Sequence, residues 1–149
     1  MGQRPLALAV MLMLAACGKS VTAPSGATCA EMLPTPILRT AGEVDYGDFV
    51  NYRLSVTNWA EFADALFTPS PTLPPCGGNS SAARTWVDIF VDDGTRIYGY
   101  CALGSARALS TDLYLPYARA RPQPRGAYIQ MVDRLCNRTV TSNVAALTP

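Results

Sequence analysis

The 149-residue chain contains no histidine and only one lysine, Lys19. Without histidine, it has no serine–histidine or cysteine–histidine catalytic pair and no imidazole ligand for zinc. Lys19 lies close to the N-terminus, which argues against a serine–lysine pair as well. Charges are few and nearly balanced, with 12 basic and 11 acidic side chains. We therefore expect no binding to nucleic acid, because net charge supplies no attraction to phosphate.

The chain also lacks an apolar run long enough to span a membrane. The longest uncharged apolar stretch, residues 6–16, has eleven residues, whereas a spanning helix needs about 20. Arg4 precedes this stretch. A positive charge followed by a short apolar run is typical of a secretory signal peptide.

A cysteine follows the apolar run at once, in the sequence Leu14-Ala-Ala-Cys17. This segment resembles the lipobox of bacterial lipoproteins. The resemblance implies that residues 1–16 are a signal peptide and that Cys17 carries the lipid. In lipoproteins of this kind, aspartate directly after the cysteine favours retention at the inner membrane. By this resemblance, Gly18 implies that the protein is anchored to the outer membrane and faces the periplasm. An ordinary cleaved signal with an unmodified Cys17 is the alternative.

Residues 17–28 are small and polar after the cysteine, which predicts a flexible tether. We expect one folded domain over residues 29–149. Four cysteines remain in it, and an even number in an exported chain favours two disulfides. Three pairings are possible; we expect Cys76–Cys101, which closes a long loop onto a hairpin, and Cys29–Cys136, which ties the start of the domain to its last hairpin. A zinc site is disfavoured because the cysteines are not in close pairs.

Seven segments have the pattern of β-strands. In the clearest one, residues 49–57, Tyr52, Leu54 and Val56 face one side and polar residues face the other. Seven short strands with intervening turns predict an all-β fold, an antiparallel β-sandwich. The expected strands are residues 37–41, 49–57, 85–91, 96–101, 112–116, 127–132 and 138–144.

The strongest hairpin signal is the Asp-Gly pair at residues 93–94, between two apolar runs. This pair predicts a two-residue type I′ turn. Such a turn places Ile89 opposite Tyr98 and Trp86 opposite Cys101. Cross-strand pairs of this kind stabilise a sheet.

An insertion interrupts the strands after residue 57. Asn58 and Glu61 match a capping box, and the next apolar residues have helical spacing, which predicts a short helix. A long proline-rich loop, residues 68–84, follows it and contains Cys76.

A second resemblance covers most of residues 29–145. Several segments are similar to a group of bacterial secreted or lipid-anchored proteins whose domain is like a fibronectin type III or immunoglobulin sandwich. The resemblance implies that fold and no activity, since fold alone does not determine function. The segments are 58–59, 73–77, 84–89, 98–103 and 142–143.

Three sets of side chains are candidates for function. Carboxylates for acid–base chemistry or calcium are Asp88, Asp92, Asp93 and Asp112, of which Asp92 and Asp93 fit a turn better. Candidates for contact with an anionic partner are Arg119, Arg121 and Arg125, with a solvated loop as the alternative. An aromatic recognition patch beside the loop is formed by Trp59, Phe62 and Phe67, unless these residues fill the end of the sandwich.

The sequence thus predicts a lipid-anchored protein of the bacterial cell envelope with one disulfide-linked β-sandwich. We expect a non-catalytic binding or structural module, without cofactor or metal, that contacts an envelope protein or a glycan through residues 59–84. An inhibitor of a periplasmic or foreign enzyme, similar to the lipid-linked lysozyme inhibitors, is the alternative. A hydrolase that uses carboxylates is the third possibility.

Overall fold

The structure, a computed structural model, describes residues 29–76, 82–111 and 113–147. This part of the chain forms eight strands and three short 3₁₀ helices. The strands are β1 (Leu38–Asp45), β2 (Phe49–Val56), β3 (Thr85–Val91), β4 (Arg96–Ala102), β5 (Leu113–Ala118), β6 (Gly126–Asp133), β7 (Arg138–Thr141) and β8 (Ala145–Ala146). The helices are η1 (Trp59–Glu61), η2 (Asp64–Phe67) and η3 (Ala106–Ser110).

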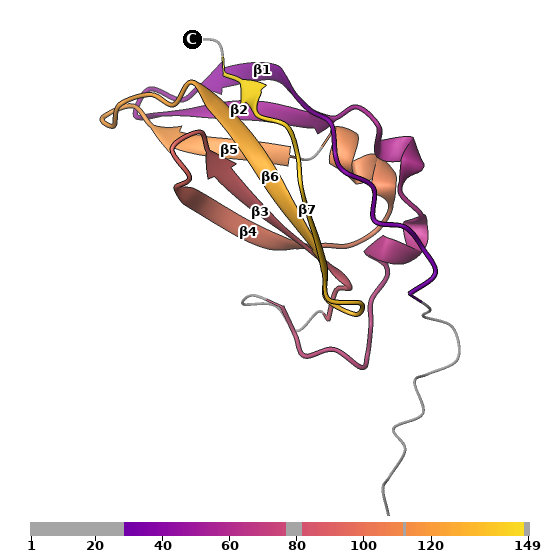
Figure 1. Cartoon of the computed structure of the whole chain (residues 1–149). Helices are drawn as coiled ribbons and strands as arrows, with labels where there is room; N and C mark the ends of the chain where they lie inside the picture. Colours follow the sequence, from indigo (N-terminus) through magenta and orange to yellow (C-terminus); the bar gives the residue numbers. More distant parts are fainter. Residues whose placement is uncertain (1–28, 77–81, 112, 148–149) are drawn as a thin grey trace, which may run out of the picture.

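The strands form two antiparallel sheets that pack face to face (Figure 1). One sheet has the order β1-β2-β5, and the other has the order β4-β3-β6-β7, with β8 also paired to β6. The all-β sandwich expected from the sequence is therefore confirmed. Among the residues described, one sheet thus has three strands and the other has five.

The core consists of the inward-facing residues of both sheets. From the first sheet come Tyr52, Leu54 and Val56, the side of β2 that the alternating pattern predicts to be buried. From the second sheet come residues such as Ile89 and Ile129, which lie opposite each other on β3 and β6. The two inner faces together exclude water from one continuous cluster, which supplies the main stabilisation of the fold.

The β3–β4 hairpin has the predicted register, but its turn differs. Ile89 lies opposite Tyr98, and Trp86 lies opposite Cys101. Only Gly94 of the turn has a positive φ, 86°, so the type I′ prediction is wrong. The Gly94 N–H and the Thr95 carbonyl both bond to Val91, which gives a three-residue loop. A bulge after Ile89 then restores the predicted register.

The predicted helix after β2 is replaced by two 3₁₀ turns, η1 and η2. Phe62 has extended backbone between them, with ψ at 128°, and this breaks the helical path. The Asn58 side chain does not cap η1. Its amide instead bonds to the backbone of Ile37 and Thr35, and to Glu61 at 3.0 Å. The break lets the apolar residues of both turns reach the core, and this burial outweighs the helical preference.

The last predicted strand, residues 138–144, divides into β7 and the short β8 around Ser142 and Asn143. The Asn143 side chain accepts a hydrogen bond from the Leu38 N–H at 2.8 Å and donates one to the Leu38 carbonyl at 2.9 Å. Asn143 thus acts as a strand partner for the start of β1 and connects the two sheets at one edge.

Both expected disulfides are present. Cys29 pairs with Cys136 across 107 residues, with 5.7 Å between the Cα atoms. Cys76 pairs with Cys101 across 25 residues, with 6.1 Å between the Cα atoms. Cys17, the signal and the tether lie outside the described residues. Among the residues described, no helix is long and apolar enough to cross a membrane.

Asn143→Ala should lower the free energy of unfolding by about 1–2 kcal/mol, because two hydrogen bonds to the part-buried Leu38 backbone are lost. The measurement is denaturant unfolding of the oxidised protein. Thr139→Ala, on the exposed surface of β7, is the matched control and should change little. Equal stability of the two variants would contradict the role assigned to Asn143.

Candidate functional site

A groove lies on the outer surface of the β1-β2-β5 sheet, next to Trp59. It encloses about 430 Å³, which is within the range of small-molecule sites in proteins. Of the aromatic residues expected to form a recognition patch, Trp59 is the one that lines this groove. The lining consists of Arg39, Ser55, Val56, Thr57, Trp59 and Ser110.

Strand pairing brings the polar residues of the groove together. Arg39 on β1 lies opposite Ser55 on β2. The next pair along the strands, Leu38 and Val56, is buried in the core. Because successive side chains of a strand alternate between faces, Arg39 and Ser55 belong to the outward face. Trp59 comes from η1, which contacts η3 beside the groove.

Three hydrogen-bond donors in the groove have no acceptor among the residues that the structure describes. Arg39 is exposed and forms no ion pair within this part of the chain. The Trp59 indole N–H and the Ser55 hydroxyl make no hydrogen bond to a described residue, although Ser55 is only 4% exposed. By contrast, the Thr57 hydroxyl donates to the Ile37 carbonyl at 3.2 Å. The groove is therefore positively charged and rich in donors.

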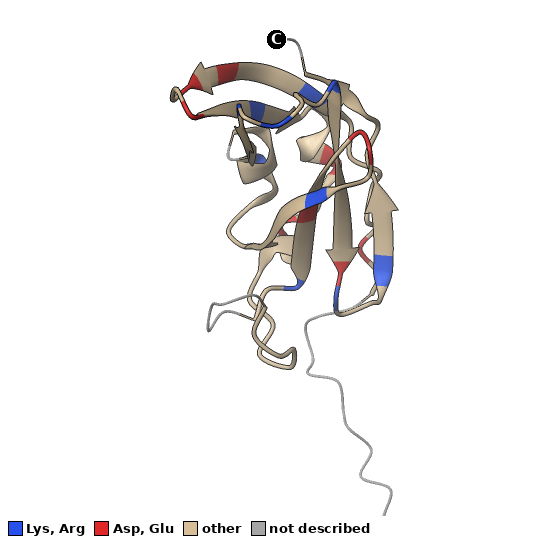
Figure 2. Ribbon diagram, turned by 90° about the vertical axis from the view of Figure 1, so that its left-hand side faces the viewer, with Lys and Arg blue, Asp and Glu red and all other residues tan. Residues whose placement is uncertain are grey.

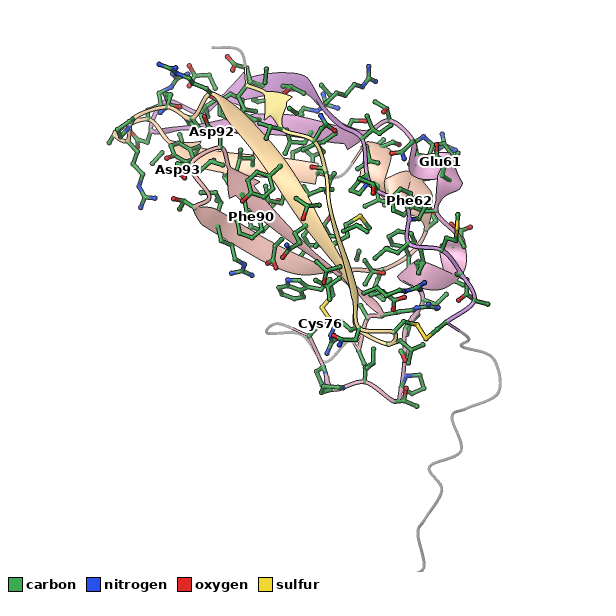
Figure 3. The ribbon with its side chains drawn as sticks, viewed as in Figure 1. Glu61, Phe62, Cys76, Phe90, Asp92 and Asp93 are labelled. Carbon is green, nitrogen blue, oxygen red and sulfur yellow. A yellow bond between two sulfur atoms is a disulfide. The ribbon has the colours of Figure 1, made fainter. Side chains whose placement is uncertain are left out.

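The other two aromatic candidates lie in the core. Phe62 is 4% exposed and Phe67 is 1% exposed, with 6.4 Å between their ring centroids. Figure 3 shows Phe62 beside the 3₁₀ helices, far from Asp92 and Asp93 at the other end of the sandwich. Phe62 and Phe67 thus fill one end of the sandwich and present no aromatic surface. Trp59 packs partly against the same cluster.

The three candidate arginines lie at or next to the β5–β6 loop, at the end of the sandwich opposite the 3₁₀ helices. Arg119 forms an ion pair with Asp45 at 2.6 Å, and both side chains are exposed. A hydrogen bond from the Gly47 N–H, followed by those from Arg119, holds the pKa of Asp45 below its usual value. Arg121 and Arg125 are exposed and form no ion pair within the described residues. Neither of them lines the groove, so they are not part of that site.

Two of the candidate carboxylates, Asp88 and Asp93, have structural partners. Asp88 forms an ion pair with Arg96 at 2.5 Å, and the Arg96 guanidinium lies 6.0 Å from the centre of the Trp86 ring. Gly99 lies opposite Asp88, and a Cβ at Gly99 would collide with the tips of all three side chains. The absence of a side chain there lets this cluster lie across β4.

Asp92 and Asp93 lie in the turn between β3 and β4, as their sequence predicts. The Asp93 carboxylate accepts the Thr95 N–H at 2.8 Å. Hydrogen bonds from the hydroxyl and the N–H of Thr95 lower the pKa of Asp93. Asp112 lies outside the described residues. Within the described ranges, no group of three or more acidic, cysteine or histidine side chains is arranged to hold a metal ion.

A buried ionic network, not anticipated from the sequence, lies near the Cys29–Cys136 disulfide. Arg84 is 2% exposed and Asp133 is fully buried. Their side chains form two hydrogen bonds, Nε to Oδ1 at 3.0 Å and Nη2 to Oδ2 at 2.9 Å. Arg138 donates to Asp133 at 2.7 Å, and Glu31 accepts from Arg84 at 3.2 Å. The alternation of β6 could have shown that Asp133 faces inward.

The network determines the ionisation of Asp133. Burial by itself raises the pKa of this carboxyl, but hydrogen bonds from Arg84 and Arg138 outweigh it, so the pKa is held below its usual value. The Asp133 hydrogen bonds in turn raise the pKa of Arg84. Both groups are therefore charged at neutral pH, and the carboxylate also accepts the N–H groups of Leu135 and Cys136. Because its hydrogen-bonding positions are occupied by protein groups, the Asp133 carboxylate forms a structural pair with Arg84. This arrangement argues against a role of either side chain as a catalytic acid or base.

A smaller cavity of about 160 Å³ lies between the end of β4 and η3. Phe67 and Leu109 form part of its apolar wall, and Cys101 of the second disulfide also lines it. It offers room for an apolar group and little polar chemistry.

No protein-family model, curated protein or solved structure matches the chain. The groove beside Trp59 is therefore interpreted from its own chemistry.

Arg84→Met and Asp133→Leu should each lower the free energy of unfolding by about 3–5 kcal/mol, because each leaves a buried charge without its partner. The double variant should lose less than the sum of the two. Chemical denaturation of the four proteins gives the coupling energy. Strictly additive losses would show that the two side chains do not stabilise one another.

Stability should also fall in acid. Because the pKa of Asp133 is lower in the folded protein than in the unfolded chain, its contribution is complete above the unfolded value. It should be lost as the pH falls below about 4 and through the folded pKa. The free energy of unfolding should therefore change less between pH 7 and pH 2 in Asp133→Asn than in the unmodified protein. The same pH dependence in both proteins would contradict the prediction.

Proposed function

We propose that the protein is a lipid-anchored binding module of the bacterial cell envelope, held at the outer membrane by acyl chains on Cys17. The observation that carries the binding role is the open, donor-rich groove beside Trp59. Its lining has one positive charge, one indole and several hydroxyl groups, a combination suited to recognition of a polar ligand.

The two disulfides support an exported protein. Disulfides persist in oxidising compartments such as the periplasm and are rare in the cytosol. The pairing of Cys29 with Cys136 leaves Cys17 as the one cysteine of the chain outside both disulfides. This is consistent with a separate role for the Cys17 sulfur, as the lipobox-like segment implies.

The position of Cys29 suits an anchor that precedes the domain. The described chain begins at Cys29, at the end of the sandwich where the disulfide to Cys136 lies (Figure 1). A flexible tether of eleven residues has an average span of roughly 18 Å. The domain would thus stay close to the membrane surface and could contact envelope components within the reach of the tether.

The charge distribution supports a selective ligand over general adhesion to an anionic surface. In the ribbon view of Figure 2, positive and negative positions are interspersed along the described chain. Without Arg4, the chain has equal numbers of basic and acidic side chains. Contact with an envelope protein or glycan would therefore depend on local chemistry such as that of the groove.

Intact mass spectrometry of protein purified from membranes tests the anchor. Cys17 should carry a diacyl or triacyl adduct, and reduction should add the four hydrogens of two internal disulfides. Cys17→Ser should remove the adduct and release the protein from the membrane fraction, because two or three acyl chains supply the membrane affinity. Ala16→Ser, which keeps a small residue at the expected cleavage site, is the control. An unmodified Cys17 in membrane-bound protein would refute the proposal.

A further inference from the structure

We propose that the groove beside Trp59 binds a saccharide that carries a carboxylate group. The inference rests on the proposed role as a binding module and specifies its ligand. It is drawn from the outward face of β1 and β2 together with η1 and η3.

Arg39 supplies the preference for an anion. Its guanidinium is the one charged group among the described residues that line the groove. Arg39 also forms no ion pair with a described residue, so its donors are available to a ligand. A guanidinium presents paired N–H groups that match the two oxygens of a carboxylate.

Trp59 supplies the preference for a sugar ring. An indole offers a flat apolar surface and one N–H donor. A pyranose ring has the complementary features, because its C–H groups form an apolar face and its hydroxyl oxygens accept hydrogen bonds. Trp59 is held by partial packing against the core, so little entropy would be lost when a ligand contacts it.

Ser55 adds a donor at the floor of the groove. Its hydroxyl makes no hydrogen bond to any described residue. The hydroxyl is not among the buried polar atoms that lack a partner, so it is reached by water in the open groove, and a ligand oxygen can take the place of that water. Ser55 lines the groove opposite Arg39, and a hydroxyl or carboxylate oxygen of a bound sugar would satisfy it.

A peptide carboxylate fits this place less well. Addition to the free backbone edge of a strand is one common way in which a protein binds an extended peptide. Here β2 is the central strand of its sheet, paired with β1 and β5. The backbone of Leu38, next to Arg39, is bonded to the Asn143 side chain. The groove lies on the face of the sheet, where it offers side-chain donors and an indole but no backbone groups of the central strand β2.

The chain has two tryptophans, which allows a direct test. In the full-length protein with Trp86→Phe, Trp59 becomes the single tryptophan, and its fluorescence reports on the groove. The probes are glucuronate, glucose, acetate and the dipeptide Ala-Ala. Isothermal titration calorimetry of the unmodified protein gives the same ranking if the Trp86→Phe protein does not fold.

Glucuronate should give a saturable change in Trp59 emission and should bind at least about tenfold more tightly than glucose, acetate or Ala-Ala. Arg39→Gln should weaken glucuronate binding about tenfold or more and leave glucose binding unchanged. Arg121→Gln, an exposed arginine at the other end of the sandwich, is the matched control and should have no effect. Ser55→Ala should weaken both sugars.

Several results would overturn the inference: no response to glucuronate, equal binding of acetate alone, tighter binding of Ala-Ala, or equal effects of Arg39→Gln and Arg121→Gln. The anchor is tested separately by the mass of Cys17. A lipidated protein that does not bind glucuronate would refute the ligand assignment but not the lipid anchor. A protein that binds glucuronate but carries no lipid on Cys17 would refute the lipid anchor but not the ligand assignment.

Discussion

The buried pair of Arg84 and Asp133 organises the end of the sandwich on which several other features depend. Asp133 occupies the last inward position of β6, and Arg84 directly precedes β3, its partner strand. Two charges in this position are tolerated only because each is fully hydrogen-bonded. The pair therefore defines where β3 begins and β6 ends.

Other segments meet at this pair. The Arg84 carbonyl accepts the Arg134 N–H, and the Arg134 side chain donates to the carbonyls of Ala83 and Pro74. The proline-rich loop is thereby attached to the β6–β7 turn by hydrogen bonds from the backbone and the side chain of Arg134. Glu31, which follows Cys29, completes the network from the N-terminal segment. The buried ion pair thus connects the N-terminal segment of the domain, the proline-rich loop and the Cys29–Cys136 disulfide.

Much of the fold could be predicted from local sequence, because strand alternation and turn residues act over short distances. The register of the β3–β4 hairpin followed from the position of Gly94, although the turn type did not. Two residues with positive φ were expected, whereas a bulge absorbs the extra residue. The disulfide pairing could be chosen because cysteines near hairpins are brought together by strand pairing.

The rest depended on contacts between distant segments. Trp59 was recognised as a candidate, but Arg39 and Ser110 are distant from it in the sequence. The pairing of β1 with β2 brings Arg39 to the groove, and the packing of η1 on η3 brings Ser110 there. The predicted helix failed for the same reason, since burial of Phe62 decided the local backbone. Asp133 was missed although alternation along β6 marks it as inward, because a charged residue is rarely assigned to a core without a known partner.

The Cys29–Cys136 disulfide gives the domain a mechanical property. Every strand from β1 to β6 lies inside the covalent loop that this bond closes. A pulling force on the chain before Cys29 would therefore pass through the sulfur atoms to the β6–β7 turn. It would bypass β1, which would otherwise be peeled from β2 one hydrogen bond at a time. Tension would act on the sandwich at a single end, where the buried ion pair is located, and the groove on β1 and β2 would keep its shape under load.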